Sequence, residues 1–246
     1  MRRCIAIVTT LPSPAEILEG ELQRRLRDLA LVMVAPVGSI AADLWPEERR
    51  SVRRAITSRQ REFATGRACA RRLLSRLGCP EVALPADSDR VPCWPDGFVG
   101  SISHAGELCV VVVGDRTTIG GVGIDIESDG PLERELWDIV LGEGERASLM
   151  TWPDDQRQIR AKLLFSAKEA VYKLQFPVTR ARIDFHAVEI ELGTESFRAH
   201  VARQGGRGDH VHGLVCAAPG FYVTLALPSA YAQPFDGRVS CFSPRR

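Results

Sequence analysis

The sequence predicts an α+β protein, because helical and strand-forming segments occur in successive runs rather than in strict alternation. The 246 residues are 45% hydrophobic and 26% charged, which allows a sizeable core. A helical pattern is followed by apolar strand segments, and after a connector at 114–120 a strand, a second helix and further strands follow. The length fits one large domain or two small ones.

The first half of the chain is expected to begin with a strand and to contain one main helical region. Residues 1–20 lack the long apolar segment of a secretion signal and fit a strand. Residues 45–80 predict helix, with an apolar face that ends at a glycine and a following proline. A turn-rich connection at 88–98 then leads to two apolar strand segments within 99–114.

The second half is expected to start with a short strand at 122–127. A helical pattern covers about 155–175 and is expected to stop before Pro177, because the residue before a proline is biased away from helix. Further strands are predicted at 184–192, 196–201 and 220–227.

Charge and cysteine usage exclude several classes of protein. The net charge is +1, with 32 basic and 31 acidic residues, which disfavours a nucleic-acid-binding protein. No segment approaches the roughly 20 apolar residues of a membrane span. The seven cysteines are scattered without a CxxC pair, so a zinc site or a disulfide framework is poorly supported. We therefore expect a cytoplasmic protein.

The strand "VGIDIE" carries two carboxylates on one face. Its apolar residues alternate with Gly123, Asp125 and Glu127, and alternate side chains of a strand point to opposite faces. The plainer interpretation of Asp125 and Glu127 is a solvated strand face. The glycines that precede them favour a close approach by a backbone or a ligand instead.

The helix "LLFSAKEAVYKLQF" places Glu169 and Lys173 four residues apart on one face. Taken alone, this spacing favours an ordinary surface ion pair. If Glu169 converges with Asp125 and Glu127, however, a cation must offset three like charges. Oxygen ligands suit Mg²⁺, which often bridges substrate phosphates, and Lys173 would then also offset phosphate charge.

The stretch "GSISHAG" at 100–106 offers hydroxyl groups and a histidine beside a small-residue turn. Ser103 and His104 are able to donate hydrogen bonds to a phosphate, although a lone histidine is as often structural. A Ser/His nucleophile pair is the competing interpretation. It is disfavoured because adjacent residues of an extended segment point apart and no G-x-S-x-G elbow is present.

Taken in order, "GSISH", "VGIDIE" and "FSAKEAVYK" resemble the motifs of the 4′-phosphopantetheinyl transferase superfamily. The likeness is greatest to its monomeric, two-lobed members that serve siderophore, polyketide and nonribosomal peptide synthetases, and it covers about residues 45–190. This resemblance implies two similar α+β lobes, related by a pseudo-twofold axis, with the active site in the cleft between them. We expect residues 1–117 to form the lobe that grips the cofactor phosphates and 118–246 the lobe with the metal and the catalytic helix.

The resemblance also implies roles for individual residues. Glu169 and Lys173 match catalytic positions of the family. The metal ligands would be Asp125, Glu127 and Glu169. The positions that would contact coenzyme A are Arg59, Arg67, Arg90, Ser103, His104, Lys168 and Lys173. Two positions depart from the family pattern, because Arg90 stands near the place of a lysine and Phe165 replaces a tryptophan.

The reaction implied by the resemblance moves the 4′-phosphopantetheine arm of coenzyme A onto a serine of an acyl or peptidyl carrier protein. Adenosine 3′,5′-bisphosphate is released, and Mg²⁺, or Mn²⁺ in its place, is the expected metal. We expect a monomer that binds neither nucleic acid nor membrane. The alternatives are a metal-dependent phosphoesterase or nuclease, and a catalytically silent protein that binds coenzyme A or the carrier. The presence of all three carboxylates disfavours the silent protein.

Overall fold

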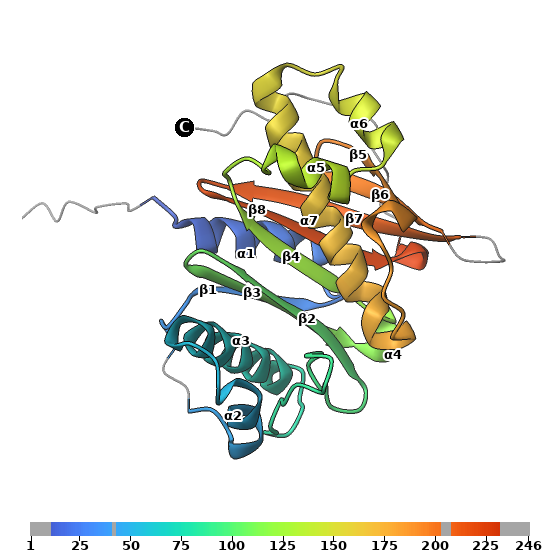
Figure 1. The fold of residues 1–246 in the computed structure, drawn as a ribbon. Helices are drawn as coiled ribbons and strands as arrows, with labels where there is room; N and C mark the ends of the chain where they lie inside the picture. Colours follow the sequence, from blue (N-terminus) through green and yellow to red (C-terminus); the bar gives the residue numbers. More distant parts are fainter. Residues whose placement is uncertain (1–10, 41–42, 203–207, 232–246) are drawn as a thin grey trace, which may run out of the picture.

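The structure is a computed structural model that describes residues 11–40, 43–202 and 208–231 (Figure 1). These residues form a three-stranded sheet and a five-stranded sheet, and every strand pair in both is antiparallel. A long helix covers the outer face of each sheet. The predicted α+β class is therefore confirmed.

The first sheet belongs to the first half of the chain and has the order β1-β3-β2. One face packs on α3 through a core that includes Leu73, Leu74 and Val111. The other face turns toward the second sheet. Its elements are β1 (Leu31–Pro36), α2 (Pro46–Val52), α3 (Thr57–Arg76), β2 (Phe98–Ala105), β3 (Leu108–Asp115) and the short α4 (Arg116–Ile119).

The second sheet has the order β4-β8-β7-β6-β5. Helices α5, α6 and α7 cover one of its faces, on a core that includes Trp137, Leu163 and Tyr222. Its elements are β4 (Gly123–Ser128), α5 (Arg134–Val140), α6 (Glu143–Leu149), α7 (Asp154–Thr179), η1 (Phe185–Ala187), β5 (Val188–Leu192), β6 (Ser196–Val201), β7 (Asp209–Ala218), β8 (Phe221–Pro228) and η2 (Ser229–Tyr231). The chain passes from the first sheet to the second between the end of β3 at Asp115 and the start of β4 at Gly123. The division of the chain into lobes at 117/118 stays a prediction.

Helix α1 (Pro14–Leu26) lies between the two sheets (Figure 1). Its buried face, including Leu18 and Leu22, joins a core to which both sheets contribute. The expected strand over 1–20 is thus wrong for the part that forms α1, and residues 1–10 lie outside the described residues. The helix begins because Ser13 and Glu16 form a reciprocal capping box around Pro14.

Helix α7 crosses β4 in direct backbone contact. A Cβ atom added to Gly123 would lie 1.9 Å from the carbonyl oxygen of Ala170 and 2.5 Å from the nitrogen of Leu174, so only glycine fits there. The predicted end of the helix before Pro177 is also wrong, since α7 runs on to Thr179. The helix leaves its axis only at Arg180, which adopts a left-handed conformation with φ 55°.

The predicted amphipathic pattern of β4 agrees with the structure in part. Ile124 and Ile126 are buried in the core between the sheets, as the alternation indicates. The opposite face is covered by α7, so Asp125 is buried rather than solvated. None of the helices in the described part of the chain combines the length and apolar composition needed to cross a bilayer.

Candidate functional site

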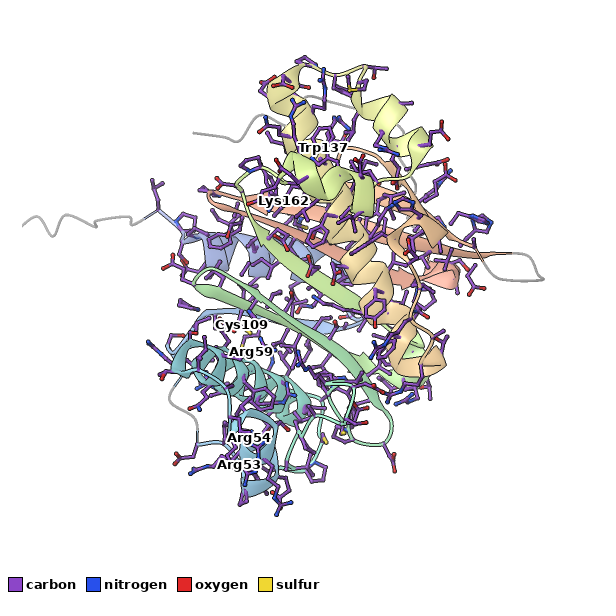
Figure 2. The ribbon with its side chains drawn as sticks, viewed as in Figure 1. Arg53, Arg54, Arg59, Cys109, Trp137 and Lys162 are labelled. Carbon is purple, nitrogen blue, oxygen red and sulfur yellow. The ribbon has the colours of Figure 1, made fainter. Side chains whose placement is uncertain are left out.

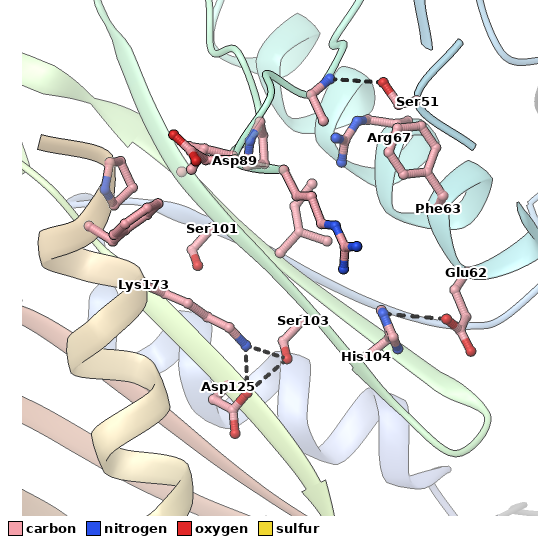
Figure 3. Close-up of a pocket in the computed structure, with 18 of the residues that line it drawn as sticks. Ser51, Glu62, Phe63, Arg67, Asp89, Ser101, Ser103, His104, Asp125 and Lys173 are labelled. Atoms are coloured by element: carbon pink, nitrogen blue, oxygen red, sulfur yellow. Dashed lines mark hydrogen bonds and ion pairs between the residues drawn. The ribbon is translucent and has the colours of Figure 1, made fainter. Parts of the chain in front are cut away.

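A pocket of about 670 Å³ lies between the two lobes and is lined by both (Figure 3). The first lobe contributes α2, α3, β2 and the loop at 86–94, and the second contributes β4 and the C-terminal part of α7. The predicted site residues that line it are Arg59, Arg67, Arg90, Ser103, His104, Asp125, Glu127 and Lys173. Residues far apart in the sequence thus face one cavity.

Asp125 stands at the centre of a polar network on the floor of the pocket (Figure 3). Lys173 Nζ lies 2.6 Å from its Oδ1 atom, and Ser103 Oγ donates to the same oxygen at 3.0 Å. On the other side, Ser166 Oγ donates to Oδ2 at 2.8 Å. The negative charge of Asp125 is therefore held by one cation and two hydroxyl groups.

The other two predicted metal carboxylates are less well compensated. Burial raises the pKa of Glu127, and the neighbouring charge of Asp125 raises it further. Lys162 Nζ, 3.3 Å from Glu127 Oε2, offsets this only in part. Figure 2 shows Lys162 on the second lobe and Arg59 on the first.

Glu169 lies one turn before Lys173 on α7 and lines an adjoining pocket of about 340 Å³. Burial raises its pKa, Lys173 lowers it, and the charges of Asp125 and Glu127 raise it again. The three carboxylates are thus close enough to interact electrostatically.

This set of donors fits Mg²⁺. Among the residues that the structure describes, no group of three or more His, Cys, Asp or Glu side chains converges tightly enough to hold a metal ion by itself. Mg²⁺ does not need such a cage, because one or two carboxylates, water molecules and substrate phosphates normally complete its shell. Lys173 and Lys162, each beside one carboxylate, occupy positions where the site already accepts positive charge.

The serines of β2 join the two lobes. Ser101 Oγ accepts a hydrogen bond from the backbone nitrogen of Ile124 at 3.1 Å, and Ser103 Oγ accepts one from Ile126 at 3.4 Å. Ser103 also accepts from Lys173 Nζ at 2.9 Å. Its only proton is directed to Asp125, so Ser103 helps to hold the carboxylate, and its contact with a phosphate beside His104 stays a prediction.

His104 points away from Ser103, toward α3. Its Nε2 atom contacts Arg59 and lies 3.4 Å from Glu62 Oε2. Burial lowers the pKa of His104, and the charge of Arg59 lowers it further. The ring is therefore neutral at neutral pH, and Arg59 is the permanent cation of this corner.

Arg67 and Arg90 line the pocket in different ways. Arg67 is buried, donates from Nε to the carbonyl oxygen of Leu84 at 2.5 Å and stacks on the ring of Phe63 at 4.0 Å. Burial lowers the pKa of Arg67 to about 10. Arg90 is exposed on the loop and adopts a positive φ of 68°. Arg67 is hence a fixed cation and Arg90 an adaptable one.

Lys168 does not join this group, although it immediately precedes Glu169. Its ammonium group lies 2.6 Å from Glu145 Oε2, 2.8 Å from the carbonyl oxygen of Val140 and 2.9 Å from that of Phe185. An ammonium group has three N–H donors, and these acceptors use all of them. In this structure its donors serve a structural role, and the expected contact between Lys168 and the pyrophosphate stays a prediction.

Ser166 and Thr224, which lie behind Asp125, were not predicted from the sequence. Ser166 precedes Lys168 by two positions and carries one of the hydroxyl groups on Asp125, and Thr224 on β8 lies 2.9 Å from Ser166. Ser166 lies on the predicted helix one turn before Glu169, which was a usable signal. Thr224 gives no such signal in an apolar strand.

Two family models match the chain. A model described as the 4′-phosphopantetheinyl transferase N-terminal domain matches residues 47–114, and one described as the 4′-phosphopantetheinyl transferase superfamily matches residues 121–215. The first match ends with β3 and the second begins just before β4, so together they span both walls of the pocket.

Curated relatives give the same result. The chain is 36% identical over 201 residues to 4′-phosphopantetheinyl transferase Svp of Streptomyces mobaraensis, covering 77% of this chain and 82% of that protein. It is 38% identical over 152 residues to 4′-phosphopantetheinyl transferase PptT of Mycobacterium tuberculosis, covering 61% and 66%. Against enterobactin synthase component D of Salmonella typhimurium, identity is 35% over 136 residues, covering 53% and 54%.

Among solved structures, the holo-[acyl-carrier-protein] synthase of Thermotoga maritima matches 45% of this chain and 63% of its own, with 23% identity and a TM-score of 0.36. That likeness is too low to support an argument. The two family models and the extent of the Svp match are sufficient to assign the family. The chain belongs to the 4′-phosphopantetheinyl transferase superfamily.

Proposed function

We propose that this chain transfers the 4′-phosphopantetheine arm of coenzyme A to a serine of an acyl or peptidyl carrier protein, with release of adenosine 3′,5′-bisphosphate. The family acts on carrier proteins and uses coenzyme A. The observation that carries the proposal is the pocket between the lobes, in which Arg59 and Arg67 of the first lobe line the same cavity as Asp125 and Glu127 on β4. A substrate with several phosphates requires cationic side chains to bind it, and a metal ion bound to those phosphates requires carboxylate ligands from the protein.

The residues of the second lobe that would hold Mg²⁺, or Mn²⁺ in its place, are Asp125, Glu127 and Glu169. The bound ion would neutralise the pyrophosphate and orient it. The raised pKa values of Glu127 and Glu169 support this assignment, because their charges are only partly offset by protein cations.

Glu169 is the proposed acceptor of the serine proton, directly or through a water molecule. As the serine oxygen forms its bond to the phosphorus that carries the pantetheine arm, the bond from that phosphorus to the bridging oxygen breaks. The electron pair leaves with adenosine 3′,5′-bisphosphate. A pKa raised by burial makes Glu169 a stronger base than an exposed glutamate.

Lys173 is proposed to stabilise the charge that develops on the leaving phosphate. Two of its N–H donors are directed to Ser103 and Asp125, and its side chain lines the pocket. A preformed cation of this kind lowers the barrier because it needs no rearrangement during the reaction. Arg59, Arg67, Arg90 and His104 are the proposed partners of the remaining cofactor phosphates.

Both walls of the pocket come from one chain, which supports action as a monomer. The roles of the two lobes, with 1–117 gripping the cofactor and 118–246 carrying metal and base, follow the same division. A cytoplasmic location remains a prediction.

The test is to incubate the purified protein with coenzyme A, Mg²⁺ and an apo carrier protein, and to measure the mass of the carrier. We expect the mass to rise by one phosphopantetheine group, EDTA to stop the reaction, and Mg²⁺ or Mn²⁺ to restore it. An unmodified carrier at saturating coenzyme A would refute the proposed function. Release of inorganic phosphate in its place would favour a phosphoesterase, and cofactor binding alone a silent binding protein.

The metal assignment has its own control. Asp125→Ala should lose transfer while the circular dichroism spectrum stays that of a folded protein. Near-normal turnover by this variant at saturating Mg²⁺ would contradict the role given to Asp125.

A further inference from the structure

Two buried hydroxyl groups lie behind Asp125, on the side away from the pocket. Ser166 on α7 and Thr224 on β8 both have 0% exposure. Asp125 and Thr224 are direct partners in the β4–β8 pairing, and α7 covers them with Ser166. Three elements thus bring Thr224, Ser166 and Asp125 into one hydrogen-bonded row, which we call the hydroxyl relay.

The direction of the relay follows from its donors. A carboxylate only accepts hydrogen bonds, so the single proton of Ser166 points to Asp125 Oδ2 at 2.8 Å. Thr224 Oγ1, 2.9 Å from Ser166 Oγ, must then be the donor of the second bond. Both O–H dipoles point the same way, toward the carboxylate.

The relay makes the two oxygens of Asp125 unequal. Oδ1 contacts Ser103 and Lys173, which both line the pocket. Oδ2 faces the buried interior and is held by Ser166. A change of the Asp125 rotamer that turned both oxygens to the pocket would leave the hydroxyl group of Ser166 buried without an acceptor, which costs free energy.

We propose that Ser166, oriented by Thr224, is a positioning residue that restricts Asp125 to one metal-binding oxygen and thereby favours Mg²⁺ over Ca²⁺. This inference rests on the metal role of Asp125 in the proposed function. Ca²⁺ accepts six to eight oxygen ligands, often with bidentate carboxylates, whereas Mg²⁺ requires a compact octahedral shell. A carboxylate with one oxygen withheld suits the smaller ion.

The experiment measures metal binding rather than turnover. Free Mn²⁺ is followed by electron paramagnetic resonance in the presence of coenzyme A and without carrier, with a protein-free blank, and Mg²⁺ or Ca²⁺ is added as competitor. Ser166→Ala should weaken Mn²⁺ and Mg²⁺ binding about 10–100-fold, the range seen when a partner of a metal ligand is removed. The preference for Mg²⁺ over Ca²⁺ should shrink.

Thr224 supplies a matched pair of variants. Thr224→Val removes the hydroxyl group at nearly constant volume and should shift the Mg²⁺ to Ca²⁺ preference in the same direction as Ser166→Ala, by less. Thr224→Ser keeps the hydroxyl group and should behave as the wild type. Thr65→Val is the control for loss of a buried threonine hydroxyl, since Thr65 bonds to Gly38 and Arg61 instead, and it should leave metal binding unchanged.

The outcomes separate this inference from the proposed function. If Asp125→Asn binds Mn²⁺ like the wild type, the metal role of Asp125 and the relay both fail. If Asp125→Asn loses binding while Thr224→Val and Ser166→Ala keep the wild-type affinity and ion preference, the relay alone is overturned. Should Ser166→Ala fail to fold, the comparison of Thr224→Val with Thr224→Ser tests the relay in its place.

Discussion

Two of the three lysines of helix α7, Lys168 and Lys173, each make a 2.6 Å ion pair, yet the surroundings of these two pairs differ completely. Lys168 and Glu145 have side-chain exposures of 0% and 3%. Lys173 is 27% exposed and its partner Asp125 5%. The two pairs lie five residues apart on the same helix, so they provide an internal comparison between a structural and a functional use of the same residue type.

The Lys168 pair is saturated with partners. Glu145 accepts hydrogen bonds from the backbone nitrogens of Gly142 at 2.8 Å and Ile190 at 2.9 Å, besides its contact with Lys168. The pair therefore ties α7 to α6 and β5, and Lys168 adds the carbonyl groups at the end of α5 and in η1. A group with every donor used holds elements together but has nothing to offer a ligand.

The Lys173 pair is open on one side. Its acceptors, Ser103 and Asp125, come from different lobes, and the ammonium group borders the pocket. The distance of an ion pair therefore does not show what the pair does. Burial and the number of unused donors separate the two cases, because desolvation makes a buried pair costly to break, whereas an open pair can exchange its partners for a ligand.

The largest effect is expected from Glu169, which lies between the two lysines. Glu169→Gln keeps the shape of the side chain but removes the proposed base and one metal charge. Turnover should fall by about 10²–10⁴-fold, the range for loss of a general base, while the melting temperature of the metal-free protein is not lowered. Carrier modification followed by mass spectrometry checks the first part and thermal denaturation the second. Full activity would show that this face of α7 is not catalytic.

Lys168→Met should act on stability instead of on cofactor binding. Breaking one partner of a buried ion pair costs about 3–5 kcal/mol of unfolding free energy, because the other charge is left buried. Urea denaturation measures this loss, and calorimetric titration with coenzyme A should show wild-type affinity for the folded protein. A lower coenzyme A affinity without a loss of stability would support the contact between Lys168 and a phosphate that the family resemblance implies.

Glu145→Gln is the matched variant for Lys168→Met. Both should lower stability, and the double variant should lose less than the sum of the single losses, because the two side chains form one interaction. Additive losses would mean that the pair does not act as a unit.

The sequence was informative wherever a local period reflects burial. The alternation around Asp125 predicted β4, and the spacing of Glu169 and Lys173 predicted a shared helix face, which the structure shows with Lys173 at the pocket. The order of three motifs then indicated the family. The alternation and the helical spacing depend only on neighbours within a few residues, and the order of the motifs is read along the chain, so a single sequence contains all three features.

What could not be predicted depends on distant segments. Lys168 differs from Lys173 because Glu145 and Phe185, contributed by other elements, surround it, and no helical period reveals that. Thr224 reaches Ser166 from a strand 58 residues further along. Similarly, β7 begins at Asp209 in a polar stretch beside glycines, and only its pairing with β6 and β8 makes it a strand.

One miss had a readable signal. The capping box of Ser13 and Glu16, with Pro14 at the first helical position, marks the start of α1 in the sequence itself. The expectation of a strand over 1–20 did not take this capping signal into account.

Lys173→Met should have a smaller effect than Glu169→Gln and Lys168→Met, and an effect of a different kind. Asp125 keeps its contacts with Ser103 and Ser166, so stability should change little. Loss of one charge-assisted contact to a phosphate is worth about 1.5–3 kcal/mol, which corresponds to roughly 10–150-fold in coenzyme A affinity. Titration calorimetry measures it, and retained Mn²⁺ binding shows that the metal site survives. An unchanged affinity would remove Lys173 from the cofactor site.

The smallest effect, and the one that tests the electrostatics directly, concerns Glu127. Burial first and Asp125 second raise its pKa above the usual 4.5. Because the pKa is higher in the folded chain than in the unfolded one, this carboxyl group adds stability below pH 4.5, and the contribution is lost as pH rises through the raised value. With metal ions removed by EDTA, Glu127→Gln should therefore have a higher melting temperature than the wild type at pH 7. The difference in melting temperature should vanish toward pH 4. Added Mg²⁺ should raise the melting temperature of the wild type more than that of the variant, because only the wild type has the Glu127 carboxylate to bind the ion. A variant that melts below the wild type at pH 7 in EDTA would mean that Lys162 already satisfies Glu127, and that this carboxylate has no need of a metal ion.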